Sequence, residues 1–244
     1  MKTKLTLFVA VLAVALFGMG CASSSLNKGL LVYYPFNGNA KDKSGNGYDA
    51  QAKNFPSPTS DRHGNPENAY KFNGIDDYVV VPDEMFTALE AVTISCWVNL
   101  DDSTDNWSYI FSGHKEGNDN LLFIGFYGEL KRLNICHKQE ILAFPMIGYV
   151  GKWKHLVVAR ADLESGFNVY LDGKWKALIK HERNYALEFA SGGVLIGPDQ
   201  DEVGGGFGEH EWLKGSLDDY RIYNRALSAE EVKALYDLEK PEEK

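Results

Sequence analysis

The segment 199–211 carries the side chains best suited to chemistry. Carboxylates and amides stand here among glycines, as Asp199, Gln200, Asp201, Glu209 and Glu211. Ca²⁺ takes six to eight oxygen ligands, and a flexible loop can bring such ligands together. Glycines help, because they allow the backbone to turn its carbonyls inward. We therefore expect a Ca²⁺ site here; the alternative is a solvated acidic loop that holds no metal.

A strand and a helix follow this loop and give it a rigid base. Residues 216–223 have a strand pattern. Ser228 and Glu231 have the spacing of a capping box, and Leu227 with Val232 forms a hydrophobic staple. These signals predict a helix from Ala229 to Leu238.

The rest of the chain consists of short strand patterns separated by turn signals. Thirteen Tyr, thirteen Phe and 24 Gly in 244 residues favour strands and turns over helices. Val92, Ile94, Cys96 and Val98 alternate cleanly and put one face inward. Asp172-Gly173 predicts a hairpin turn, and 54–68 is interpreted as one long surface loop. The pattern predicts an all-β sandwich or barrel.

The net charge of −9 argues against a nucleic-acid partner, since no basic stripe is present. The first twenty residues are interpreted as a secretory signal. Lys2 and Lys4 precede an apolar run from Leu5 to Phe17, which is too short to span a bilayer comfortably. The chain is therefore expected to be exported.

Cys21 follows Gly20 in a pattern that resembles a bacterial lipobox, in which the cysteine becomes the lipidated N-terminus. The pattern departs from the family at Gly18, where leucine is preferred, and simple cleavage is the alternative. We expect a signal at 1–20, a tether at 21–28, one domain at 29–238 and a charged tail at 239–244. The predicted location is the outer membrane or cell surface, otherwise the periplasm or medium, with membrane contact only through the lipid.

Five segments in order carry a family resemblance. They are YYPFNGNAKDKSGNGYDA (33–50), YKFNGIDDYVVVP (70–82), VTISCWVNL (92–100), WKHLVVARADLESGFNVYLDGK (153–174) and GSLDDYRIYNRALSAEEV (215–232). Together they resemble the laminin-G-like jelly roll of the concanavalin A-like superfamily, including its pentraxin branch. The resemblance implies an all-β, two-sheet antiparallel jelly-roll sandwich with one short C-terminal helix.

The pentraxin resemblance also implies a ligand set for Ca²⁺. In that branch an Asp-Asn pair and a later acidic loop build the site, and Asp119-Asn120 matches the pair. Side-chain oxygens would come from Asp119, Asn120, Asp199 and Asp201, and Gln200 would offer its backbone carbonyl. The family acid after Phe207 is missing, because Gly208 stands there with Glu209 one step later. Glu211 falls where the family has an amide ligand. These departures put a second Ca²⁺ in doubt more than the first.

Catalytic patterns are mostly missing. Jelly-roll glycosidases need two carboxylates flanking a bond, and the E-x-D-x-x-E pattern is absent. Asp218 and Asp219 are adjacent, so on a strand they would point to opposite faces. No zinc motif or nucleophile elbow occurs, and His155 is expected to pack within a strand.

Two pairs of residues leave alternatives open. Trp107 and Trp212 flank the ligand segments, and each could stack on a sugar ring or simply pack under the loop rim. Cys96 and Cys136 could form a disulfide in an exported protein or remain two buried thiols.

The sequence favours a non-catalytic surface module that binds a glycan or similar extracellular ligand with the help of Ca²⁺. One alternative is a carbohydrate-active enzyme, a glycoside hydrolase or lyase of the jelly-roll superfamily. Another is a structural or adhesion protein of the cell envelope.

Overall fold

The computed structural model describes residues 25–101, 107–115, 118–128, 132–137, 140–145, 148–180 and 186–242, without the side chains of 118–121, 137 and 140–142. The signal segment 1–20 and Cys21 lie outside the described residues, so both stay predictions. Within the described part, no helix is long and apolar enough to cross a lipid bilayer.

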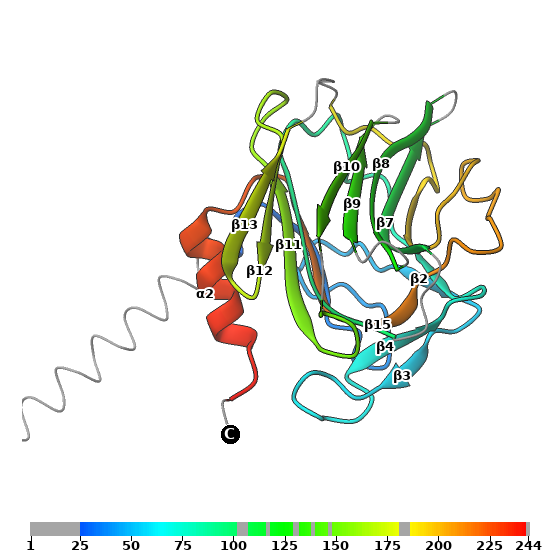
Figure 1. The fold of residues 1–244 in the computed structure, drawn as a ribbon. Coiled ribbons are helices and arrows are strands. Elements are labelled where there is room, and N and C mark those ends of the chain that lie inside the picture. Colours follow the sequence, from blue (N-terminus) through cyan, green and yellow to red (C-terminus); the bar gives the residue numbers. More distant parts are fainter. Residues whose placement is uncertain are drawn as a thin grey trace, which may run out of the picture.

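Two antiparallel sheets form a sandwich (Figure 1), as the sequence predicts. The eight-stranded sheet has the order β13 (Lys174–Ile179), β12 (Phe167–Leu171), β11 (Lys154–Arg160), β6 (Val92–Leu100), β15 (Lys214–Tyr223), β4 (Ala69–Asn73) and β3 (Ser57–Thr59), with β1 (Leu30–Tyr34) also paired to β15. The seven-stranded sheet has the order β10 (Glu140–Pro145), β9 (Arg132–His137), β8 (Asn118–Tyr127), β7 (Trp107–Lys115), β14 (Val194–Gly197), β5 (Tyr78–Val80) and β2 (Gln51–Lys53).

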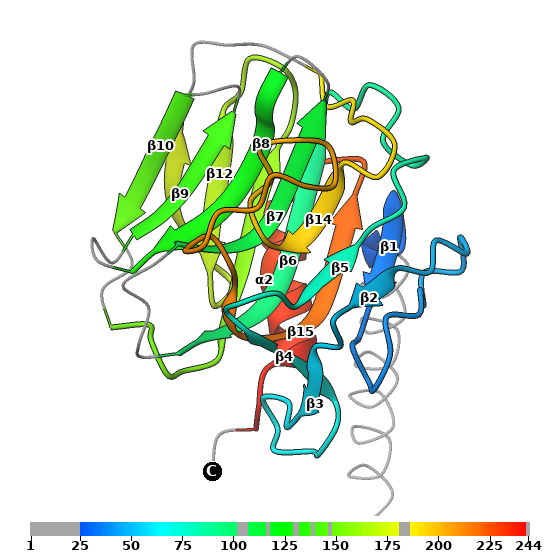
Figure 2. The same cartoon turned by 90° about the vertical axis from the view of Figure 1, so that its right-hand side faces the viewer.

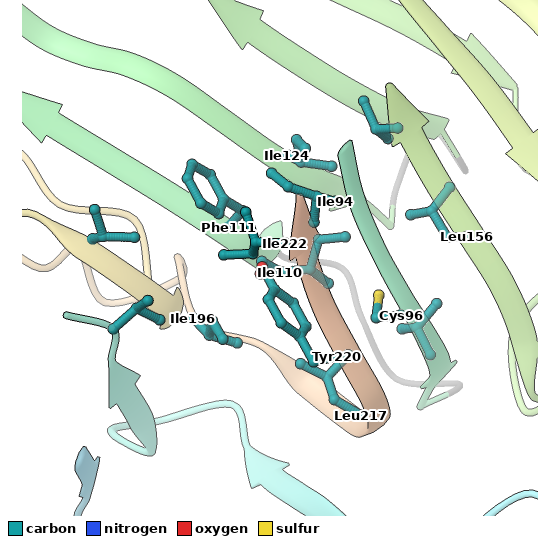
Figure 3. Packing of buried hydrophobic residues seen from close by; sticks show 14 of the residues in the cluster. Ile94, Cys96, Ile110, Phe111, Ile124, Leu156, Ile196, Leu217, Tyr220 and Ile222 are labelled. Carbon is teal, nitrogen blue, oxygen red and sulfur yellow. The ribbon is translucent and has the colours of Figure 1, made fainter. Parts of the chain in front are cut away.

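The core lies between the two sheets. Ile94, Cys96 and Leu156 reach it from the eight-stranded sheet, and Phe111 and Ile124 reach it from the other (Figure 3). The alternation predicted for β6 is therefore confirmed. Fully burying one such aliphatic or aromatic side chain contributes about 1.5–3 kcal/mol, so the sandwich holds together largely through this layer.

The helix α2 (Ala229–Glu239) covers the outer face of the eight-stranded sheet (Figure 1). The predicted capping box is present: Ser228 Oγ accepts from Glu231 N–H, and the Glu231 side chain accepts from Ser228 N–H. Leu227 and Val232 pack together in a second apolar cluster with Val157 of β11. Because α2 covers this face, β11 is buried on both sides.

Two local predictions have different outcomes. The hairpin at Asp172-Gly173 is confirmed, with φ of 50° and 71° at the two residues that join β12 to β13. The single long loop predicted at 54–68 is wrong in part, because β3 forms at Ser57–Thr59 and pairs with β4. A three-residue strand containing Pro58 gives too little alternation to be recognised.

Candidate functional site

The loop between β14 and β15 crosses the outer face of the seven-stranded sheet over β7 and β8 (Figure 2). Gln200 fixes it there. Its Nε2 donates to Ser112 O at 3.1 Å and to Gly193 O at 3.1 Å, and its Oε1 accepts from Gly204 N–H at 2.9 Å. The amide side chain is thus fully engaged in holding the loop, which leaves the backbone carbonyl as the part of Gln200 that fits the predicted ligand set.

Asp199 lies beneath this loop and is 5% exposed. Ser112 Oγ lies 3.4 Å from its Oδ1, and Tyr109 also hydrogen-bonds to the carboxylate. Burial, reinforced by the charges of Glu211 and Asp201, raises the pKa of Asp199 to about 7. Within the described residues no lysine or arginine pairs with Asp199, so its negative charge is stabilised only by hydrogen bonds.

Glu211 stands next to Asp199, since Asp199 N–H donates to Glu211 O at 2.9 Å. A Cβ placed on Gly208 would collide with the Glu211 carboxylate. The Glu211 side chain thus lies directly against residue 208, and a side chain at 208 would require the flexible Glu211 carboxylate to move. Asp201 and Glu209 are exposed on the same loop.

Asp119 and Asn120 belong to the start of β8, but their side chains lie outside the described part. Their strand is placed near the loop by its pairing, because Gly113 of β7 faces both Leu122 of β8 and Val194 of β14. Among the described residues, no three Asp, Glu, His or Cys side chains come together as a metal site. The predicted ligand set thus depends on the Asp119-Asn120 pair for completion.

Trp107 lies half-buried on the same outer face, in a group of aromatic rings. Its ring centroid is 4.9 Å from Tyr127, 5.5 Å from Tyr109 and 5.8 Å from Phe123. The backbone N–H of Trp107 donates to His210 O at 3.1 Å, which ties the aromatic group to the acidic loop. We call these four aromatic residues the aromatic platform.

The sequence left two roles open for Trp212, stacking on a sugar or packing under the loop, and its contacts are those of a packing residue. It is 8% exposed, its Nε1 donates to Gly208 O at 2.8 Å, and its ring packs on Phe207 at 4.9 Å. A ring held this way supports the loop from below and is not available to stack on a sugar.

Asn134 and Arg132 were missed by the sequence analysis. Asn134 pairs with Gly125 of β8, which itself pairs with Tyr109, and it shares a face with Cys136 of the outer aromatic cluster. Asn134 is fully buried, yet neither its Oδ1 nor its Nδ2 has a hydrogen-bond partner among the described residues. Nε of Arg132 is also unpartnered, and its guanidinium lies 5.9 Å from the Tyr127 ring. A polar residue at an outward position of a strand is common, so no signal in the sequence marked them.

A family model for the concanavalin A-like lectin/glucanases superfamily, of the laminin G type, matches residues 73–233. The chain belongs to this superfamily. Its lectin-like jelly roll is related to pentraxins, as the sequence analysis inferred.

Two curated relatives illustrate the relationship. A sushi, von Willebrand factor type A, EGF and pentraxin domain-containing protein of Rattus norvegicus is 26% identical over 172 residues, which cover 68% of this chain and 5% of that protein. C-reactive protein 1.1 of Limulus polyphemus is 29% identical over 167 residues, covering 64% of this chain and 65% of the relative. The chain thus spans only a small part of the first relative.

Among solved structures, the ligand binding domain of botulinum neurotoxin serotype D in complex with N-acetylneuraminic acid has a TM-score of 0.66 at 17% identity. The match covers 89% of this chain and 53% of that one. At this identity the similarity shows the fold alone.

The remaining acidic pair of this jelly roll is engaged in structure. Arg62 donates to Asp218 and, at 2.6 Å, to Asp219, and both carboxylates are buried. Residue 219 has φ of 48°, and the sheet is irregular between residues 218 and 221. The bulge turns both acids toward one guanidinium, so the expectation that neighbouring strand residues face opposite sides is wrong here.

His155 is a packed residue, as expected. It is fully buried, and its Nε2 lies 3.0 Å from Ser95 Oγ. Burial, together with the charges of Arg221 and Arg62, lowers the pKa of His155 to about 3. The ring is therefore neutral at physiological pH.

The possible disulfide between Cys96 and Cys136 does not form, and both are free, buried thiols. Cys96 of β6 points into the core between the sheets, whereas Cys136 of β9 lies in the outer cluster with Tyr109 and Phe123. The two cysteines belong to different sheets and different layers, which keeps their sulfurs apart.

Proposed function

We propose that this lectin-like domain is a non-catalytic module that binds a glycan on the outer face of its seven-stranded sheet. The observation that carries the proposal is the fully buried Asn134, whose amide donor and acceptor have no partner beside the aromatic platform. Leaving one buried polar group unpaired costs about 1–3 kcal/mol. A protein retains such a cost where a ligand or an ordered water completes the hydrogen bonds.

The chemistry around Asn134 suits a sugar. A pyranose ring has an apolar face of C–H groups that packs on an aromatic ring, and hydroxyls that both donate and accept. Trp107 and Tyr127 offer ring surface, and Arg132 offers an unpartnered Nε–H beside them. Asn134 and Arg132 Nε are buried on the strand next to the platform, so a sugar stacked on Trp107 would reach them through an ordered water or once the platform rings shift to admit it.

We further propose that Ca²⁺ fixes the acidic loop against the start of β8. The available donors are carboxylate, amide and backbone oxygens, which is the ligand chemistry that Ca²⁺ prefers. The charges of Glu211 and Asp201 disfavour the ionised form of the buried Asp199, and a divalent cation would relieve this repulsion. Asp119 and Asn120 would complete the set. Glu209, which is exposed, belongs to it only if the loop closes further.

The engaged state of Asp218, Asp219 and His155 supports a binding module over an enzyme, since none of the three is available as a general acid or base. About half of the botulinum neurotoxin serotype D ligand binding domain shares this fold, and that domain has been solved with N-acetylneuraminic acid, which is compatible with a glycan ligand.

The proposed location is the cell surface, with Cys21 as the lipid-bearing residue. The first described residues lead away from the glycan face. Arg225 Nη2 donates to Ser25 O at 2.9 Å, and Leu26 packs with Leu235 of α2 on the outer side of the eight-stranded sheet. An anchored chain would therefore present the aromatic platform away from its attachment point.

A glycan array probed with the chain, in Ca²⁺ and in a chelator, tests the glycan proposal. We expect retention on at least one glycan, and we expect Trp107→Ala to weaken it at least about tenfold, since burying a large apolar side chain against a ligand contributes about 1.5–3 kcal/mol. Phe55→Ala is the matched control, because Phe55 is 84% exposed and lies away from the platform. Equal retention by both variants would contradict the proposal.

Thermal unfolding tests the metal separately. We expect Ca²⁺ to raise Tm in a concentration-dependent manner, as a ligand of the folded state must. Asp199→Asn should lose this rise, whereas Glu202→Gln, an exposed neighbour on the same loop, should keep it. A rise that persists in Asp199→Asn would place the ion elsewhere.

A further inference from the structure

The strands at the sheet edges differ in how well they are protected. β2 and β3 are only three residues long, β3 contains Pro58, and β10 ends at Pro145. Short edges and prolines are common devices against unwanted strand pairing. β13 has neither device, because it runs for six residues without proline and pairs only with β12 among the described strands.

β1 shows that this chain also covers edges with side chains. Ser44 Oγ donates to Leu31 O at 3.1 Å, and Asn46 Nδ2 donates to Leu30 O at 2.8 Å. Asp42 accepts from Tyr33 N–H at 3.0 Å on the same edge. No comparable side-chain bond reaches the backbone of β13 in the described part, which leaves its outer edge free to pair.

β13 also exposes two large apolar side chains. Trp175 is 55% exposed and Leu178 is 42% exposed. Both lie on the outer face of the sheet around Asn168, which pairs with Leu178 and accepts from Trp175 Nε1 at 2.9 Å. The hydrogen bond holds the indole in one orientation, so little side-chain entropy remains to be lost on binding. Tryptophans of this kind are over-represented among residues that dominate interface energy.

Three lysines give this edge a positive charge in an acidic protein. Lys174, Lys176 and Lys180 are exposed, and none of them forms an ion pair with a described residue. Edge lysines can serve simply to repel other strands. Exposed apolar side chains such as Trp175 and Leu178 favour association, which an edge built only to repel strands would avoid. We therefore interpret the lysines as favouring a partner with negative charge.

We propose that the free edge of β13 docks an extended acidic segment of a partner protein, which adds to the eight-stranded sheet as a further strand. Backbone groups of the partner would pair with β13, its carboxylates would meet the lysines, and its apolar side chains would cover Trp175 and Leu178. A second copy of this chain fits poorly, because antiparallel self-pairing would bring lysines of one β13 close to lysines of the other.

The probe is a blocked eight-residue peptide that alternates glutamate and valine, titrated into the ¹⁵N-labelled chain and followed by amide shifts and calorimetry. We expect shifts confined to β12, β13 and their neighbours. N-methylation of alternate peptide residues, which removes strand donors but keeps the charge, should weaken binding at least about tenfold. A lysine–valine peptide should not bind.

Variants of the chain complete the test. Trp175→Ala and Lys176→Glu should each weaken the peptide at least about tenfold, while Lys152→Glu, an exposed lysine off the strand, should not. Unchanged Tm would show that the variants fold. The proposal is overturned if no β13 amide shifts at millimolar peptide, if the N-methylated peptide binds equally well, if heparin shifts the same amides as strongly, or if sedimentation shows pairing of the chain with itself through β13.

Discussion

The two outer faces of the sandwich treat buried polar groups in opposite ways. Under α2, on the eight-stranded sheet, Arg62 pairs with Asp218 and Asp219, and Arg221 pairs with Glu239. Glu239 also accepts from Trp97 Nε1 at 2.9 Å. Every one of these buried charges has an opposite charge beside it.

The outer face of the seven-stranded sheet holds polar groups without such partners. Asp199 is buried near two other carboxylates, Asn134 has an unpaired amide, and Arg132 Nε has no acceptor. On the first face, His155 Nδ1 and Glu239 Oε1 have no hydrogen bond among the described residues, but the His155 ring is neutral and Glu239 Oε1 forms an ion pair with Arg221. The buried polar groups on the first face therefore find their partners within the chain, whereas those on the second face need a partner from outside it.

Arg62→Ala should give the largest effect, because it leaves two buried carboxylates without their shared partner. We expect a loss of about 3–5 kcal/mol in the free energy of unfolding, measured by urea titration. Lys41→Ala breaks an exposed pair with Asp49 and should cost at most about 1 kcal/mol. A small loss for Arg62→Ala would mean that the first face is not a self-completing cluster.

Asp199→Asn should instead stabilise the metal-free chain at a pH above the folded pKa of Asp199. The folded pKa of Asp199, about 7, is above the ordinary aspartate value of 3.8, so its stabilising contribution is full below the unfolded pKa and is lost as the pH rises through the folded pKa. Asp218 has a pKa raised to about 7 for the same main reason, burial, and adds to the same slope.

We therefore expect stability without metal to fall between about pH 4 and 7, and the fall to be smaller in Asp199→Asn. At pH 8 this variant should be more stable than the parent by on the order of 1–3 kcal/mol, measured by urea unfolding in chelator. Equal pH profiles would show that Asp199 carries no such penalty.

Asn134→Leu sharpens the contrast further. Removing a buried, unpaired amide should raise the free energy of unfolding by about 1–2 kcal/mol while reducing glycan retention on the array. Asn168→Leu is a control on the other sheet, where the amide is bonded to Trp175. If Asn134→Leu destabilises the chain, the amide must have a partner, and the comparison between the faces fails.

Ser228→Ala should give the smallest effect. It removes the cap of α2, which covers the self-completed face, and should cost about 1 kcal/mol. Thermal unfolding of this variant should leave the Ca²⁺-dependent rise in Tm unchanged, because α2 lies on the opposite side from the acidic loop. A lost metal response would connect the two faces.

Much of the fold could be predicted, because the signals are local. Alternation in β6, the capping box at Ser228 and the turn at Asp172-Gly173 depend on neighbours a few residues apart. β3 escaped prediction because three residues are too few for a period to appear. The fate of Cys96 and Cys136 was open for another reason: which layer a strand faces depends on its partners.

The acidic loop of the candidate site could be predicted from the sequence, but the neighbouring residues on the seven-stranded sheet could not. Asp199 and Glu211 stand out as oxygen ligands among glycines, whatever the fold. Tyr127 lies opposite Trp107, and Asn134 lies across Gly125 from Tyr109, only because of the order β9, β8, β7 in the sheet. Such neighbours are brought together by pairing at long sequence separation, which no local pattern encodes.

The sequence by itself determined an all-β sandwich or barrel, the capped helix and the acidic loop, since these follow from periodicity, turn chemistry and composition, and the family resemblance added the jelly-roll class. Only the tertiary structure decided that Gln200 and Trp212 support the loop, that the Glu211 carboxylate lies against Gly208, and that Asp218 and Asp219 both pair with Arg62. The physical reason is that hydrogen bonds, burial and charge pairing depend on which atoms meet, and that is set by how the two sheets stack.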